Sequence, residues 1–235
     1  IAPLGWHVVI YFEAVDLPEL WDFFTTLPTT VVVDHMGRPN VDKPIDGPEF
    51  SLFLKFMREL NRLGLTSVID AGGGFQNYPE DYEVIDTLHR RGELTLRIAY
   101  NLFTQKPQQE REDFARWVSS NQYRQGDDYL RLNGAGEMLV YSAADFEDFR
   151  VPRPDMPKSM ESELREVVRV LARNRWPFRL HTTYNETIER ALDVYEEVHR
   201  EIPFEGLRWF FDHCETVSER SLERIRALGG GIAVQ

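Results

Sequence analysis

The chain has 235 residues, of which 42% are hydrophobic, so it can bury a substantial core; the length suits one α/β barrel as well as two ordinary domains, and one domain is the default. Its formal net charge of −12 argues against a nucleic-acid partner, because phosphate binding needs a basic face. The single cysteine, Cys214, excludes an intramolecular disulfide and a zinc site built on paired cysteines. No apolar run reaches the roughly 20 residues of a membrane span, and a signal-peptide pattern is absent. We therefore expect a cytoplasmic protein without a membrane or nucleic-acid partner.

Segments rich in β-branched and aromatic residues alternate along the chain with segments of helical periodicity. In chain order, strands are predicted over 6–12, 29–35, 65–71, 94–102, 129–141, 177–183, 207–214 and 229–235. Helices are predicted between them, over 17–26, 48–63, 80–91, 109–119, 159–174, 186–201 and 217–227. Near-continuous apolar strands joined by crossover helices indicate a parallel sheet, and eight strands are enough to close a barrel.

The predicted fold is therefore a (β/α)₈ TIM barrel of eight parallel strands. An open doubly wound sheet is the alternative, although Gly72–Gly74 lacks the spacing of a dinucleotide-binding loop. Because Ile1–Gly5 is too short for a helix and the last strand reaches Gln235, we expect one covering helix to be missing. The uncovered flank would favour a homodimer. The proline-rich segment 142–158 is expected to form a loop over the barrel mouth.

Three histidines stand where a predicted strand gives way to the start of a helix. They are His35 in VVVDHMGRP, His181 in RLHTTYNET and His213 in WFFDHCET. In a TIM barrel the carboxyl ends of the strands converge on one mouth, so the three imidazoles could meet there. Three imidazoles with an open position could hold zinc and activate water for attack on a carbonyl. Alternatively, His35 and His181 form structural hydrogen bonds, and Asp212 fixes the tautomer of His213 or pairs with an arginine.

Two parts of the chain resemble different branches of the amidohydrolase superfamily. Residues 1–58, with GWHVVIYFEAVDLPELWDFF and VVVDHMGRP, closely resemble the middle of the 2-pyrone-4,6-dicarboxylate lactonases. From about residue 61, GLTSVIDAGGGFQNYPEDYEVIDTLHRRGELTLRIAYNLF, LHTTYNETIERALDVYEEV and RWFFDHCETVSERSLERIRALGGGIAVQ resemble the YtcJ-like amidohydrolases. We therefore predict a single TIM-barrel domain over 1–235 that is a chimera, with lactonase-like βα units in 1–60 and YtcJ-like strands and helices in 61–235.

The resemblance implies a divalent metal held by an HxH motif, a carboxylated lysine or an acid, two further histidines and an aspartate. This chain has no HxH motif, and none of its four lysines falls in a predicted strand. The strand that carries the superfamily aspartate is not expected before Gln235. His35, His181 and His213 nevertheless keep the offsets between strands that the superfamily shows. We therefore expect these three to bind a divalent metal, with zinc favoured, and the alternative is that no metal binds.

Two acids and two lactonase-like side chains complete the predicted site. Glu13, at the end of the first strand, occupies the circular place of the missing aspartate and is predicted to act as a base. Glu137, on the fifth strand, stands at the place of the bridging ligand and is predicted to be catalytic. By resemblance, Tyr11 and Arg38 would bind the substrate, since an arginine donates two parallel hydrogen bonds to a carboxylate. Alternatively, Arg38 anchors its own loop through a nearby aspartate.

The remaining predictions concern the single cysteine and the activity of the whole chain. Cys214 follows His213 and should face the other side of the strand, so we predict a small buried apolar side chain and not a nucleophile. For the whole chain, one hypothesis is a metal-assisted hydrolase of an amide, lactone or related bond in a small molecule, impaired by its missing ligands. The other is a chimeric or engineered scaffold that catalyses nothing, because catalysis requires groups held within about half an ångström.

Overall fold

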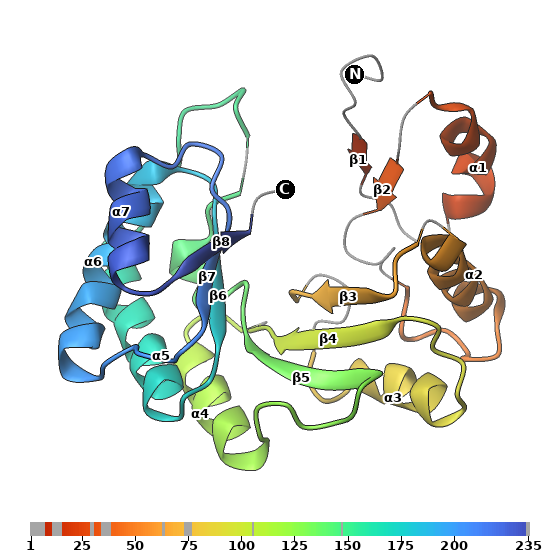
Figure 1. Cartoon of the computed structure of the whole chain (residues 1–235), viewed down its shortest axis with the longest axis horizontal. Helices are drawn as coiled ribbons and strands as arrows, with labels where there is room; N and C mark the ends of the chain where they lie inside the picture. The colour runs from red at the N-terminus through yellow and green to blue at the C-terminus, as the bar shows by residue number, and fades with distance from the viewer. Residues whose placement is uncertain are drawn as a thin grey trace. The chain divides into compact units, whose positions relative to one another are not determined.

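A computed structural model describes residues 8–10, 16–28, 31–33, 39–62, 64–72, 77–104, 106–146 and 148–233. Within these residues a helix follows each of the first seven strands, in the predicted order (Figure 1). The chain divides into two compact units, residues 1–100 with 126–131 and residues 101–125 with 132–235. The alternation of strands and helices confirms the predicted α/β class.

The strands described here belong to two sheets. β1 (Val8–Ile10) and β2 (Val31–Val33) pair in parallel. The second sheet has the hydrogen-bonded order β3 (Ser67–Asp70), β4 (Arg97–Leu102), β5 (Leu130–Ala135), β6 (Phe178–Thr182), β7 (Trp209–His213) and β8 (Gly231–Ala233). The pairs β3–β4, β5–β6, β6–β7 and β7–β8 are parallel, as predicted. The described strands do not form one continuous sheet of eight, so closure of the barrel stays a prediction.

The helices begin and end within a few residues of their predicted bounds. They are α1 (Leu17–Thr26), α2 (Pro48–Arg62), α3 (Tyr82–Arg90), α4 (Glu110–Ser120), α5 (Met160–Arg173), α6 (Asn185–Glu201) and α7 (Glu219–Ala227). α7 begins after Ser218, whose hydroxyl oxygen accepts a hydrogen bond of 3.1 Å from the backbone N–H of Ser221. None of the described helices is long and apolar enough to cross a membrane.

In the first unit, aromatic residues of α2 supply much of the core. Phe50 and Phe53 lie one helical turn apart, are fully buried, and meet edge to face with ring centroids 6.4 Å apart. The amide of Asn61, near the end of the same helix, donates hydrogen bonds to the carbonyl oxygens of Leu65 and Thr95. These bonds tie the end of α2 to the segments that lead into β3 and β4.

In the second unit, an aromatic cluster packs between the sheet and its helices. Phe178 of β6 stacks on Trp209 of β7 with ring centroids 6.4 Å apart, and Tyr195 of α6 lies parallel to Phe211 of β7 at 5.4 Å. None of these four side chains is more than 1% exposed. Figure 1 shows α5, α6 and α7 side by side on one face of these strands. This packing fixes β6 and β7, whose carboxyl ends carry two of the predicted histidines.

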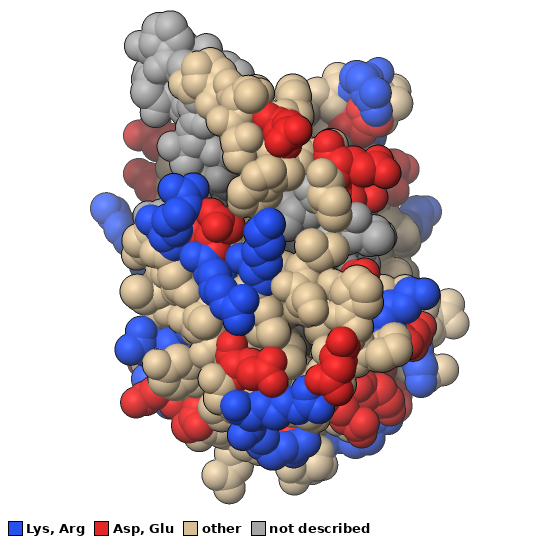
Figure 2. Space-filling model, turned by 90° about the vertical axis from the view of Figure 1, so that its right-hand side faces the viewer, with Lys and Arg blue, Asp and Glu red and all other residues tan. Residues whose placement is uncertain are grey.

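Ion pairs connect the helices of the second unit across their exposed faces. Arginines of α5 and α7 bind acids of α6 in the pairs Arg165–Glu197 at 2.7 Å, Arg169–Glu201 at 2.8 Å and Arg224–Glu196 at 2.7 Å. On the face drawn in Figure 2, basic and acidic side chains are likewise interspersed among the described residues. That face therefore carries charges of both signs side by side.

The predicted fifth strand, 129–141, is longer than the strand that forms. β5 ends at Ala135, and the next element is a short 3₁₀ turn, η4 (Tyr141–Ala143). Gly134 and Gly136 have φ angles of 134° and 95°, a region that favours glycine and interrupts a regular strand. Glu137, predicted on the strand, therefore lies in the loop that follows it.

Replacement of Phe211 by alanine tests the aromatic cluster. We expect Phe211→Ala to lower the free energy of unfolding by about 3–5 kcal/mol, because it leaves a cavity among fully buried rings. Urea unfolding followed by circular dichroism measures this change. Phe149→Ala is the matched control, since Phe149 is 65% exposed, and its effect should stay within about 0.5 kcal/mol. Equal effects of the two substitutions would contradict the prediction.

Candidate metal centre

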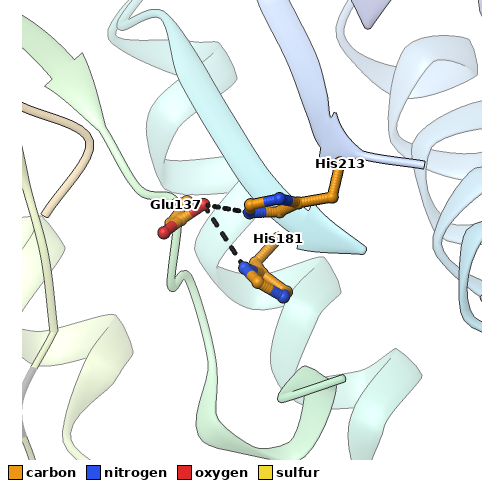
Figure 3. Close-up of side chains that lie close together, drawn as sticks. All are labelled: Glu137, His181 and His213. Atoms are coloured by element: carbon orange, nitrogen blue, oxygen red, sulfur yellow. Dashed lines mark hydrogen bonds and ion pairs between the residues drawn. The ribbon is translucent and has the colours of Figure 1, made fainter. Parts of the chain in front are cut away.

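Three side chains from consecutive strand ends of the second unit converge (Figure 3). Glu137 follows β5, His181 lies near the end of β6, and His213 ends β7. Glu137 Oε2 lies 3.4 Å from His181 Nδ1 and 3.2 Å from His213 Nε2. One oxygen or nitrogen atom from each residue lies within 4.8 Å of the others, so this group could hold a metal ion.

Gly136 allows Glu137 to approach β6. A Cβ atom at Gly136 would clash with the backbone carbonyl oxygen of Arg179, so a larger residue does not fit there. The backbone N–H of Gly136 donates to the carbonyl oxygen of Leu102 in β4 at 2.8 Å, and the N–H of His181 donates to the carbonyl oxygen of Glu137 at 2.9 Å. The loop is therefore held by hydrogen bonds from both sides at the point where the carboxylate leaves it.

A left-handed backbone conformation turns His213 toward His181. The β6–β7 register pairs His181 with Asp212 and Thr182 with His213. Because successive strand residues point to opposite faces, a regular strand would place His213 on the face away from His181. Instead His213 and Cys214 have φ angles of 76° and 61°, and the two imidazole centroids lie 4.1 Å apart. Such conformations cost about 1–3 kcal/mol each and are concentrated at functional sites.

The three groups are largely buried, and their charges are coupled. The exposed fraction of the side chain is 12% for Glu137, 7% for His181 and 13% for His213. Burial opposes ionisation of Glu137, but the hydrogen bonds to the two histidines outweigh it and lower its pKa from 4.5 to about 2. Burial also opposes protonation of His213, but the Glu137 carboxylate outweighs it and raises the pKa of His213 from 6.5 to about 9. At neutral pH, Glu137 is therefore a carboxylate beside an imidazolium.

Asp212 pairs with an arginine, which is one of the two alternatives that the sequence left open. Arg179 Nε donates to Asp212 Oδ2 at 2.8 Å, and Arg179 Nη2 donates to Asp212 Oδ1. Burial keeps the pKa of Asp212 above its ordinary value although the guanidinium lowers it. Sequence reasoning missed Arg179, yet its position two residues before His181 places both on one face of β6.

The predicted loop 142–158 contacts the candidate centre. The Phe146 ring lies 5.0 Å from the His181 imidazole at an interplanar angle of 61°. The Thr183 hydroxyl donates to the carbonyl oxygen of Asp145 at 2.8 Å, and the N–H of Tyr184 donates to the Asp145 carboxylate at 3.1 Å. This loop is therefore attached to the residues that directly follow β6.

Several predicted site residues fall where the structure gives no description. Tyr11, Glu13, His35 and Arg38 all lie outside the described residues, so their predicted roles remain predictions. Glu137, predicted as a catalytic residue at the place of the bridging ligand, lies with the two histidines at the carboxyl ends of β5–β7. Within the described part of the chain, the candidate centre consists of two imidazoles and one carboxylate.

The sequence matches two models of known protein families. A model described as the amidohydrolase family matches residues 49–235. The chain belongs to the amidohydrolase family. A second model, described as amidohydrolase, matches residues 1–92 of this family member. The recognition made from the sequence motifs is thereby confirmed at the level of the superfamily.

Individual relatives cover only parts of this amidohydrolase. A 2-pyrone-4,6-dicarboxylate hydrolase from Comamonas testosteroni is 85% identical over 59 residues, which are 25% of this chain and 19% of that protein. An uncharacterized metal-dependent hydrolase from Pyrococcus horikoshii OT3 has a TM-score of 0.55 at 16% identity, covering 80% of this chain and 37% of its own. Another from Pyrococcus furiosus has a TM-score of 0.54 at 16% identity, covering 97% of this chain and 56% of its own. At this identity the likeness to the solved structures shows the fold alone.

The thiol of Cys214 should react slowly in the folded protein. Cys214 is buried, as predicted, and burial raises its pKa from 9.0 to about 11. Because the thiolate is the reactive form, we expect a disulfide reagent at pH 8 to label the native protein about 100-fold more slowly than the urea-unfolded chain. Absorbance of the released aromatic thiol measures both rates. Equal rates would show that Cys214 is accessible and ionisable.

The coupled charges predict how stability depends on pH after metal is removed with a chelator. The raised pKa of His213 gives stability that is complete below pH 6.5 and lost as pH rises through about 9. The lowered pKa of Glu137 gives stability that is complete above pH 4.5 and lost as pH falls through about 2. We therefore expect the difference in unfolding free energy between the native sequence and His213→Gln to be largest between pH 4.5 and 6.5.

Urea unfolding from pH 4 to 10 measures this difference. Arg150→Gln provides the control, because Arg150 forms an exposed pair with Asp148 in a different segment. Its effect should not follow the same pH profile. A His213→Gln effect that stays constant from pH 6 to 10 would contradict the coupling.

Proposed function

We propose that the chain is a hydrolase that uses a divalent metal to cleave an amide, lactone or related carbonyl bond in a small molecule. The observation that carries this proposal is the convergence of Glu137, His181 and His213 within 4.8 Å in a member of the amidohydrolase family. Two imidazoles and one carboxylate are a known ligand set of catalytic zinc, which keeps a further position open. The donor atoms and their burial thus fit a zinc ion.

The side chains of the cluster are suited to this chemistry. A divalent metal supplies a Lewis acid that polarises a carbonyl group. The low pKa of Glu137 keeps its carboxylate available as a ligand at neutral pH. His213 must release its proton before it can serve as a ligand, since only the neutral imidazole nitrogen coordinates. Hydrolysis then adds the oxygen of water to the carbonyl carbon, breaks the bond to the leaving nitrogen or oxygen, and delivers a proton to that atom.

The proposed roles of four further residues come from the sequence. We propose His35 as an additional imidazole ligand, Glu13 as the base that accepts the proton of water, and Tyr11 and Arg38 as substrate contacts. The fork of an arginine suits a substrate that carries a carboxylate. These assignments require the closed eight-stranded barrel, which we propose for the whole chain.

A chimeric barrel without activity is the second candidate. Two observations favour it. The match at 85% identity extends over only 59 residues, and the ranges matched by the two family models overlap over residues 49–92. A join in this region would combine strands of two branches. Ligands displaced by about 1 Å would abolish catalysis while the fold remained intact.

Zinc binding provides the first test of the proposed function. We expect the purified chain to bind close to one equivalent of zinc, and His181→Ala and His213→Ala to weaken binding at least 100-fold, because each removes a direct ligand. Isothermal titration calorimetry at pH 7 measures the affinity. The zinc-loaded chain should also hydrolyse members of an amide and lactone panel, and both variants should lose this activity.

His89→Ala is the matched control for these variants. His89 pairs with Asp127 in the first unit, so we expect its replacement to leave the zinc affinity unchanged. Native-like zinc affinity in both His181→Ala and His213→Ala would overturn the proposed metal centre. Tight zinc binding without hydrolysis of any substrate would favour the inactive chimera.

A further inference from the structure

We infer that Phe146 determines specificity by selecting carbonyl substrates that carry an apolar, preferably aromatic, substituent. The inference rests on the proposed function and adds the chemical class of the substrate. It concerns a residue of the loop after η4 that is outside the predicted ligand set. Three observations on this loop support it.

The first observation is an exposed aromatic ring beside the candidate centre. The Phe146 side chain is 60% exposed, and its ring centroid lies 5.0 Å from that of His181. His181 in turn lies 3.4 Å from the Glu137 carboxylate. A molecule bound at the candidate centre is therefore within reach of the Phe146 ring. An apolar group on that molecule would cover ring surface that now faces water.

The second observation is that Asp145 and Asp148, which flank Phe146 in the sequence, are both hydrogen-bonded to the segment after β6. Asp145 is fully buried and bonded to the Thr183 hydroxyl and the Tyr184 N–H. On the other side, the N–H of Asp148 donates to the Tyr184 hydroxyl at 3.3 Å. Both anchors belong to the segment that directly follows β6, the strand of His181. The ring is thus positioned before a ligand arrives, which reduces the ordering cost of binding.

The third observation is that the position of the ring distinguishes Phe146 from other exposed apolar residues of the loop. Phe149 is 65% exposed, but its ring lies against Tyr184 at 5.7 Å between centroids. Phe146 therefore combines exposure with contact to a candidate ligand. Aromatic pairs prefer offset or edge-to-face contact, which an aromatic substituent can make with a fixed ring. Phe149 provides a control of the same residue type and a similar exposure.

The test compares two probes on the zinc-loaded chain. Acetohydroxamate and benzohydroxamate chelate zinc through the same two oxygens and differ only in a methyl or a phenyl group. Isothermal titration calorimetry gives the ratio of their affinities for the native sequence, Phe146→Ala, Phe146→Leu and Phe149→Ala. Because each ratio is taken within one zinc-loaded variant, a change in zinc affinity cancels, and the difference in acidity between the two probes is the same for every variant and cancels when the ratios are compared.

We expect the preference for benzohydroxamate to fall about fivefold in Phe146→Ala, by less in Phe146→Leu, and not at all in Phe149→Ala. The same ratio in Phe146→Ala as in the native sequence, with zinc and both probes bound, would overturn this inference and leave the proposed function standing. Failure of the native chain to bind zinc would overturn the proposed function and this inference together.

Discussion

The approach of one carboxylate to two imidazoles depends on two departures from regular strand geometry. At the end of β5, Gly136 lets the chain pass against the backbone of β6, where a Cβ atom would clash. At the end of β7, a positive φ angle turns His213 onto the face that His181 occupies. With regular strands, the imidazole of His213 would point away from His181, and Glu137 would lie farther along β5. The candidate centre is therefore a product of local backbone conformation held by the surrounding sheet.

Two largely buried acids at the ends of β5 and β7, Glu137 and Asp212, each pair with a basic side chain. Arg179 and Asp212 neutralise each other on neighbouring strands, and Glu137 pairs with His213. A buried charge without a partner costs several kcal/mol, so these four groups depend on one another. Among the described residues, Glu137 is the carboxylate whose oxygen groups with a nitrogen of each imidazole within 4.8 Å. The arrangement keeps one ionised ligand oxygen directed at both rings.

The candidate centre lies within the part of the chain that matches one family model. Glu137, His181 and His213 all belong to residues 49–235 and to the second compact unit. The segment that is 85% identical to the Comamonas testosteroni hydrolase covers only 25% of the chain. The described cluster therefore lies entirely within the residues that the amidohydrolase family model matches.

The sequence by itself determined the order of strands and helices and the location of two histidines at strand ends. Apolar periodicity and helix-start signals are local properties, so α5, α6 and the strands beside them were predictable within a few residues. The burial of Cys214 was also predicted, but Cys214 follows the end of β7 with a left-handed backbone, so regular strand alternation is not its cause. The family relationship was also predictable from short motifs, because each motif lies in one continuous stretch of the chain.

Only the tertiary structure decided which groups meet. The apolar residues Met138–Val140 extended the predicted fifth strand, whereas the glycines before them end it and place Glu137 in a loop. The pairing of Arg179 with Asp212, which stand 33 positions apart, and the contact of Phe146 with His181 arise from the packing of neighbouring strands and their loops. The orientation of His213 depends on a backbone conformation that residue periodicity does not encode. Periodicity reports which face a regular element buries, while the site is built where regular geometry stops.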